Sequence, residues 1–231
     1  MSWKWFCLTL INLMKFELLV FDWDGTLMDS EARIVACVEA AVKDLDLPSP
    51  GREAIRNIIG LGLREAVHAL FPDAGEHLHL DIADRYRNHF FTSTETPSEL
   101  FPGAKEVIES LHDEGYLLAV ATGKGRTGLD HALESTELGR YFHITRCASE
   151  TFSKPHPEML NQIIEEMGVL PGQALMIGDT EYDLQMAANA NMPSLAVTYG
   201  VHEKARLLLH NPLACFDAIS DIPPWLKAYC V

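Results

Sequence analysis

The chain lacks several features of secreted, membrane-spanning and nucleic-acid-binding proteins. Its five cysteines are odd in number and scattered, with no C-x-x-C pair, so neither a disulfide framework nor a zinc finger is expected. Basic residues are few: 18 Lys and Arg stand against 33 Asp and Glu, and the formal charge of -15 repels nucleic acid. No apolar run is long enough to cross a bilayer. We therefore expect a cytoplasmic protein with reduced thiols and with no nucleic-acid or membrane partner.

The first fourteen residues are apolar and carry a single charge, Lys4. This run is too short to span a membrane and lacks the small-residue cleavage site of a signal peptide. We expect residues 1–14 to be an N-terminal extension outside the folded domain, and a targeting signal is the alternative interpretation.

Short apolar runs alternate with helical patterns along most of the chain. The apolar runs cover residues 16–21, 117–121, 174–177 and 194–197, and each is typical of a strand buried on both faces. Helical periodicity covers residues 103–113, 126–135 and 157–167. This alternation predicts an α/β fold, a Rossmann-like doubly wound parallel sheet.

One long stretch, residues 30–91, breaks the alternation because it shows helical periodicity only. It predicts an inserted α-helical cap domain, entered and left through linkers at residues 26–30 and 92–103. We therefore expect residues 15–28 and 97–231 to form the core domain and residues 29–96 to form the cap domain.

Residues that can take part in catalysis or bind a ligand follow three of the predicted strands. Asp22 and Asp24 lie two residues apart after the first strand, so both face one way along extended chain and suit nucleophilic attack and proton transfer. Thr122 and Gly123 follow the second strand and offer a hydroxyl and backbone N–H groups for phosphoryl oxygens. After the third strand comes Asp179. In parallel sheets ligands bind at these carboxyl ends, so one site is expected.

A phosphate beside several carboxylates requires a cation. Each pair of like charges costs on the order of 4 kcal/mol at about 4 Å in a medium of effective dielectric constant near 20. Oxygen-only ligands with room for water favour Mg²⁺ as the cofactor. Lys154 supplies a second positive charge, and Asp183, four residues after Asp179, faces the same side of a predicted helix. The expected partner is a small phosphorylated metabolite.

Four motifs, taken in order, resemble those of the haloacid dehalogenase superfamily. They are DWDGT at residues 22–26, the strand end at Thr122, Lys154 within SKPHPEML, and GDTEYD at residues 178–183. The likeness is to the phosphatase branch, to phosphoglycolate phosphatases and beta-phosphoglucomutases in particular, and runs from about residue 15 to residue 196. Any one motif is weak, whereas all four at strand ends are specific.

The resemblance implies a role for each residue that matches a motif. Asp22 would be the nucleophile, which becomes an aspartyl-phosphate, and also a metal ligand. Asp24 would protonate the leaving oxygen and then activate water, with its backbone carbonyl on the metal. Thr122 and the Gly123 amide would hold the transferring phosphoryl group.

The remaining implied roles concern charge balance and substrate binding. Lys154 would balance the phosphoryl charge, Asp179 would bind Mg²⁺ and Asp183 would support that metal site. Residues 60–64 resemble the cap loop that meets the substrate in related phosphatases, and Arg64 is the candidate for binding a distal anion of the substrate. An exposed arginine at a helix start is the alternative.

The resemblance also narrows the reaction. Dehalogenases of this superfamily lack an acid at the position of Asp24, phosphomutases often have Val at the position of Thr26, and phosphonate-cleaving enzymes use a cap lysine, where this insertion contains only Lys43. The leading expectation is a Mg²⁺-dependent phosphatase acting on a phosphoglycolate-like or sugar-phosphate-like monoester. A phosphomutase and a phospho-receiver-like signalling module are the alternatives.

Two basic residues outside the four motifs are expected to have no catalytic role. Lys124 is predicted to be a surface residue near the mouth of the site, and His68 a packed or solvated histidine. The sequence does not distinguish a monomer from a homodimer.

Overall fold

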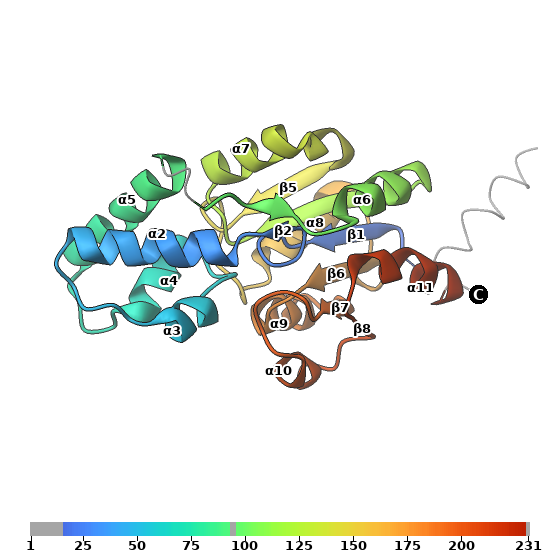
Figure 1. Ribbon diagram of the computed structural model, residues 1–231. Coiled ribbons are helices and arrows are strands. Elements are labelled where there is room, and N and C mark those ends of the chain that lie inside the picture. The colour runs from blue at the N-terminus through green and yellow to red at the C-terminus, as the bar shows by residue number, and fades with distance from the viewer. Residues whose placement is uncertain (1–15, 93–95, 230–231) are drawn as a thin grey trace, which may run out of the picture.

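A six-stranded parallel sheet forms the centre of the molecule (Figure 1). The computed structural model describes residues 16–92 and 96–229, so the predicted extension at residues 1–14 lies outside the described residues. The strand order is β5-β4-β1-β6-β7-β8, and every neighbouring pair is parallel. The predicted doubly wound α/β fold is confirmed.

Four of the strands match the apolar runs of the sequence, and the two edge strands do not. The matched strands are β1 (Leu18–Phe21), β4 (Leu117–Thr122), β6 (Ala174–Gly178) and β7 (Ser194–Val197). The edge strands are β5 (Ile144–Cys147) and β8 (Cys215–Phe216), which sequence analysis missed. β5 is buried only at its two end residues, and β8 has two half-buried residues, so neither forms a continuous apolar run.

Helices cover both faces of this sheet (Figure 1). They are α6 (Ala104–Asp113), α7 (Arg126–Thr136), α8 (Glu158–Met167), α9 (Glu181–Asn189), α10 (Lys204–Leu208) and α11 (Ile222–Tyr229). Because alternate strand residues face opposite sides, Leu19 and Phe21 pack against α6, α7 and α11, whereas Leu18 and Val20 pack against α8 and α9. Two hydrophobic layers therefore fix β1 at the middle of the sheet.

The second part of the molecule is the helical insertion, which consists of α2 (Glu31–Asp44), α3 (Arg52–Asn57), α4 (Leu63–Leu70) and α5 (Glu76–Thr92). Helix α2 packs along α5, and α4 packs on the other part of α5. The chain enters and leaves through β2 (Met28–Asp29) and β3 (Glu99–Leu100), which pair as a short antiparallel ribbon. Segments predicted as linkers thus include paired backbone, because the two crossings lie side by side.

The helical insertion lies against the carboxyl ends of the strands. The Gly62 amide donates a hydrogen bond of 2.8 Å to Ser153 Oγ, and Arg56 Nη2 donates one of 3.0 Å to the Val201 carbonyl. Tyr182 Oη donates to the Asn57 carbonyl at 2.8 Å. In the described part of the chain, no helix combines the length and the apolar composition that a membrane crossing requires.

Candidate active site

The end of β1 places Asp22 and Asp24 at the carboxyl edge of the sheet. The Asp22 amide still donates to the Ile177 carbonyl at 2.9 Å, so Asp22 is held by the ladder itself. Gly25 then turns the chain with a φ of +84°, and a Cβ on it would lie 2.2 Å from Asp179 Oδ2. Only glycine permits both this turn and the close approach of Asp179.

Lys154 lies between two buried carboxylates. Its Nζ is 2.7 Å from Asp22 Oδ1 and 2.6 Å from Asp183 Oδ1, and the lysine side chain is fully buried. Asp22 Oδ2 is also buried and has no hydrogen-bond partner among residues 16–92 and 96–229. A buried carboxylate oxygen without a partner is costly, so this atom is open to a cation or a substrate.

Hydrogen bonds fix Asp179 from distant segments and Asp183 from its own helix start. Asp179 accepts a hydrogen bond from Thr26 Oγ1 at 2.8 Å and another from the Val201 amide at 2.8 Å. Asp183 Oδ2 accepts from the amide and hydroxyl of Thr180, at 3.1 and 2.7 Å, across the first turn of α9. Both carboxylates are therefore oriented before any ligand arrives.

The core cluster, which we define as Asp22, Asp179 and Asp183, carries more negative charge than Lys154 can balance. Burial raises the pKa of Asp22 well above its usual value, and Lys154 only partly opposes this. Burial, followed by the charge of Asp183, raises the pKa of Asp179 to about 7. Burial alone would lower the pKa of Lys154, but Asp183 and Asp22 outweigh it and hold that pKa above its ordinary value.

A divalent cation fits the charge and the geometry of the core cluster. Each of its three residues offers a carboxylate oxygen, and these oxygens lie within 4.8 Å of one another. The cluster is fully buried, and it supplies oxygen ligands only. Such a donor set can hold a hard cation.

Asp24 has different partners. Ser30 Oγ donates to its Oδ1 at 2.5 Å, and Lys124 Nζ lies 2.9 Å from the same oxygen. The Lys124 side chain is only 9% exposed, so the prediction of a surface residue is wrong. The ring of Phe90, on α5, lies 4.7 Å from the ammonium and covers it. The structure thus adds Ser30 and Lys124 to the residues around the site.

Thr122 and Gly123 lie beside Asp22, at the end of β4. Thr122 is buried, and its Oγ1 accepts from the Lys124 amide at 3.2 Å. A Cβ on Gly123 would lie 2.4 Å from the Leu61 carbonyl oxygen. Because Gly123 has no side chain, the loop between α3 and α4 can approach the site closely.

A cavity of about 660 Å³ opens above these residues, between the sheet and the helical insertion. Asp22, Asp24 and Thr122 line the cavity on the side of the sheet, and residues of the helical insertion, many of them apolar, line the other side. Arg64 is also on its wall, where Nη2 lies 3.3 Å from Glu76 Oε1 and the side chain is 72% exposed. The structure therefore brings the other predicted site residues together and leaves Arg64 at the rim.

The parts of this site have complementary chemistry. Asp22 is a carboxylate beside a cation, Asp24 is a second acid at the cavity, and Thr122 and Gly123 offer donors to an anion. Together, the doubly wound α/β fold and these groups suit phosphoryl transfer at the carboxyl edge of the sheet.

Comparison with known proteins gives the same assignment. Residues 19–197 match the family described as haloacid dehalogenase-like hydrolase. A "Probable phosphatase IndB" of Dickeya dadantii is 34% identical, with 89% of this chain and 91% of that protein aligned. A phosphoglycolate phosphatase of Vibrio parahaemolyticus is 28% identical, with 89% and 94% aligned.

A solved structure shares the fold over nearly the whole chain. The crystal structure of a predicted phosphoglycolate phosphatase from Haemophilus somnus superposes with a TM-score of 0.81 at 26% identity, covering 91% of this chain and 97% of that one. The present chain therefore belongs to the haloacid dehalogenase-like hydrolase family.

Proposed function

We propose that this chain is a Mg²⁺-dependent phosphatase that hydrolyses a small phosphomonoester through an aspartyl-phosphate on Asp22. The observation that carries the proposal is the position of Asp22. This residue lines the cavity, pairs with Lys154 at 2.7 Å and lies in a cluster with Asp179 and Asp183. With Lys154 and a bound cation beside it, Asp22 would be ionised despite its burial and could attack phosphorus directly.

The reaction divides into two displacements at phosphorus. An oxygen of Asp22 forms a bond to phosphorus while the bond to the alcohol oxygen breaks, and Asp24 gives its proton to that oxygen. Asp24 then takes a proton from water, whose oxygen bonds to phosphorus as the Asp22–phosphorus bond breaks. Inorganic phosphate leaves, and both aspartates return to their starting protonation states. Ser30 and Lys124 hold the Asp24 carboxylate in position for both steps.

Mg²⁺ would be held by Asp22, Asp179 and the main-chain carbonyl of Asp24, with Asp183 supporting the site. The buried Asp22 Oδ2, with no hydrogen bond to the described residues, and the oxygen-only ligand set support this choice. When bound, Mg²⁺ neutralises negative charge that gathers around the phosphoryl group. Lys154 supplies the fixed part of that neutralisation, and Thr122 with the Gly123 amide binds the phosphoryl oxygens.

The helical insertion acts as a cap in this proposal, and it limits the substrate to a small molecule. It closes the cavity over Asp22 through the loop at Gly60 and Leu61, which excludes water during transfer. Phosphoglycolate-like and sugar-phosphate-like monoesters are the substrate classes we propose, on the names of the relatives and on the cavity size. Arg64 would exchange its exposed contact with Glu76 for a distal anion of the substrate.

The test is phosphate release from a panel of phosphorylated metabolites in the presence of Mg²⁺. Asp22→Asn should lower kcat by at least about a thousandfold, since amide nitrogen and oxygen are poor nucleophiles. Asp29→Asn, an exposed aspartate on β2, is the matched control and should retain activity. With an aryl phosphate, whose leaving group needs no proton, Asp24→Asn should accumulate a phosphorylated protein that is detectable by mass spectrometry after acid quench. Phosphate release that survives in Asp22→Asn refutes the proposal.

A further inference from the structure

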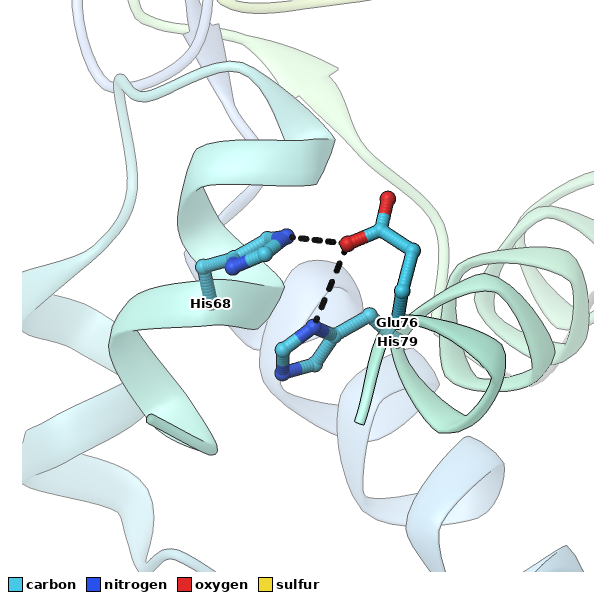
Figure 2. Close-up of side chains that lie close together, drawn as sticks. All are labelled: His68, Glu76 and His79. Atoms are coloured by element: carbon cyan, nitrogen blue, oxygen red, sulfur yellow. Dashed lines mark ion pairs between the residues drawn. The ribbon is translucent and has the colours of Figure 1, made fainter. Parts of the chain in front are cut away.

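A second group of possible metal ligands lies in the helical insertion, away from the core cluster. The insertion cluster, which we define as His68, Glu76 and His79, joins the end of α4 to the start of α5 (Figure 2). One ligand atom of each residue lies within 4.8 Å of those of the other two. None of these residues takes part in the chemistry proposed above.

Both imidazoles face the same carboxylate oxygen. His68 Nε2 lies 3.3 Å from Glu76 Oε2, and His79 Nδ1 lies 3.9 Å from that oxygen (Figure 2). The two ring centroids are 3.9 Å apart, so the rings are in contact. Two nitrogens and one oxygen thus converge from two helices on one small volume.

The second nitrogen of His79 determines which ring atom is free. Its Nε2 lies 2.8 Å from the Phe71 carbonyl oxygen, which can only accept, so Nε2 carries a proton. In the neutral ring, Nδ1 then carries a lone pair that points toward Glu76. A hydrogen bond from one ring nitrogen to a backbone carbonyl is also how metal-bound histidines are oriented in proteins.

The two nitrogens that face Glu76 are buried, and Glu76 is the partner that lies nearest to them. The His79 side chain is 6% exposed, and neither its Nδ1 nor His68 Nε2 makes a hydrogen bond within the described ranges. A lone pair of His79 and a carboxylate oxygen therefore face each other at 3.9 Å, too far for a hydrogen bond to join them. A cation between them would satisfy both groups at once.

We propose that the insertion cluster is a binding site for a divalent transition-metal ion, with Zn²⁺ the best match. Two imidazoles and one carboxylate match zinc in ligand type and leave a fourth position for water. Tetrahedral ligands at zinc distances lie about 3.3 Å apart. The two imidazole nitrogens lie 3.3 and 3.9 Å from Glu76 Oε2, so these two contacts are already close to that spacing. Glu76 and His68 are 55% and 41% exposed, which gives the ion a route in.

The site would join α4 to α5 and so fix the turn between them, residues 71–75. A metal ion bound there would share Glu76 with Arg64, which lies on the cavity wall and contacts the other carboxylate oxygen. The site itself depends on neither Mg²⁺ nor turnover, so its test is separate from that of the phosphatase reaction.

The experiment titrates the full, chelator-treated chain with Zn²⁺, with excess Mg²⁺ present to occupy the core cluster. Binding is followed by calorimetry, and the zinc environment by X-ray absorption. Wild type should bind one Zn²⁺ with imidazole ligands. His68→Gln and Glu76→Gln should weaken that binding by at least about tenfold each, because each removes one ligand. Their side chains are partly exposed, so both variants should fold, which circular dichroism verifies.

The matched control is His77→Gln, on the same turn of α5, with a side chain that is 91% exposed. It should bind Zn²⁺ as wild type does. Zinc affinity that is equal in wild type and His68→Gln would overturn the proposal, as would an absorption spectrum without imidazole scattering. A cluster that holds only a proton between His79 and Glu76 gives that same overturning result.

Discussion

The core cluster and the insertion cluster each bring three possible metal ligands together, but the chain builds them in opposite ways. Asp22 and Asp179 at strand ends and Asp183 in the first turn of α9 are all buried. Lys154 pairs with Asp22, donors from distant segments hold Asp179, and the neighbouring Thr180 holds Asp183. His68 and Glu76 lie on helix surfaces open to solvent, and only His79 is buried. One cluster is fixed by the sheet, and the other by the packing of two helices.

This difference determines what each cluster can tolerate. The core cluster concentrates negative charge in a dry place, so it depends on Lys154 and on close-packed glycines. In the insertion cluster, water can solvate His68 and Glu76, whose side chains are 41% and 55% exposed. We therefore expect substitutions in the core cluster to cost far more than chemically similar ones in the insertion.

The largest difference should come from removing one charge in each cluster. Lys154→Met leaves Asp22 and Asp183 buried without their counter-charge and should lower the free energy of unfolding by about 3–5 kcal/mol. Glu76→Gln removes only exposed contacts and should change it by less than about 1 kcal/mol. Urea denaturation in the presence of a chelator measures both.

The exposed Lys43→Met is the control for loss of a lysine charge in that comparison. If Glu76→Gln were as costly as Lys154→Met, the contrast between the clusters would be lost.

Two glycines sharpen the comparison. A Cβ on Gly25 would lie 2.2 Å from Asp179 Oδ2, at a φ of +84°, so Gly25→Ala should destabilise the fold by about 1–3 kcal/mol and displace the Asp179 carboxylate. Gly75 precedes Glu76 in the insertion, and a Cβ there would meet no atom of the described chain within 4 Å. Gly75→Ala should therefore fall within about 0.5 kcal/mol of wild type. Equal losses in thermal denaturation would contradict this expectation.

The strand ends could be predicted because their strands are continuous apolar runs. β1, β4 and β6 are almost entirely buried, so the sequence shows where each stops and which polar residue follows. The edge strand β5 has two half-buried central residues, Thr145 and Arg146, and therefore shows no such run. Burial on both faces is what made the site residues of the core visible.

Contacts between distant segments could not be predicted in the same way. The Lys124 side chain is only 9% exposed and lies over the ring of Phe90, from a distant helix, and no local pattern indicates that contact. The Val201 amide reaches Asp179 through a loop with no motif of its own. His68 meets Glu76 and His79 only because α4 packs on α5, although the i, i+3 spacing of the latter pair was visible. This contact depends on the angle at which α4 packs on α5. The shapes of the packed side chains determine that angle.

A third expectation concerns the contact between the two parts of the molecule. Lys124 joins Asp24 in the core to Phe90 in the insertion, at 2.9 and 4.7 Å. Lys124→Met should reduce kcat/KM for a phosphomonoester by about tenfold, since Asp24 loses a charged partner that positions it. The exposed Lys227→Met serves as the control. Steady-state kinetics with unchanged kcat/KM would show that Ser30 alone positions Asp24.

The smallest expected effect is a pH dependence of stability centred on His202, which lies beside the core cluster. Burial lowers the pKa of His202 from its ordinary 6.5, and its Nδ1 accepts a hydrogen bond of 3.0 Å from the Glu181 amide. The folded state therefore binds a proton less readily than the unfolded state. Its contribution to stability is complete above pH 6.5 and is lost as the pH falls through the lower, folded-state pKa.

His202→Gln should flatten that dependence, because glutamine can accept the same hydrogen bond but does not titrate. The measurement is the free energy of unfolding of wild type and variant in urea, above pH 7 and below pH 6. Wild type should lose more stability on acidification than the variant does. His77→Gln in the insertion, at a side chain 91% exposed, is the control and should follow wild type. If His202→Gln lost stability on acidification as steeply as wild type, titration of His202 would not contribute to that loss, and the unequal burial of the two clusters would have no counterpart among the histidines.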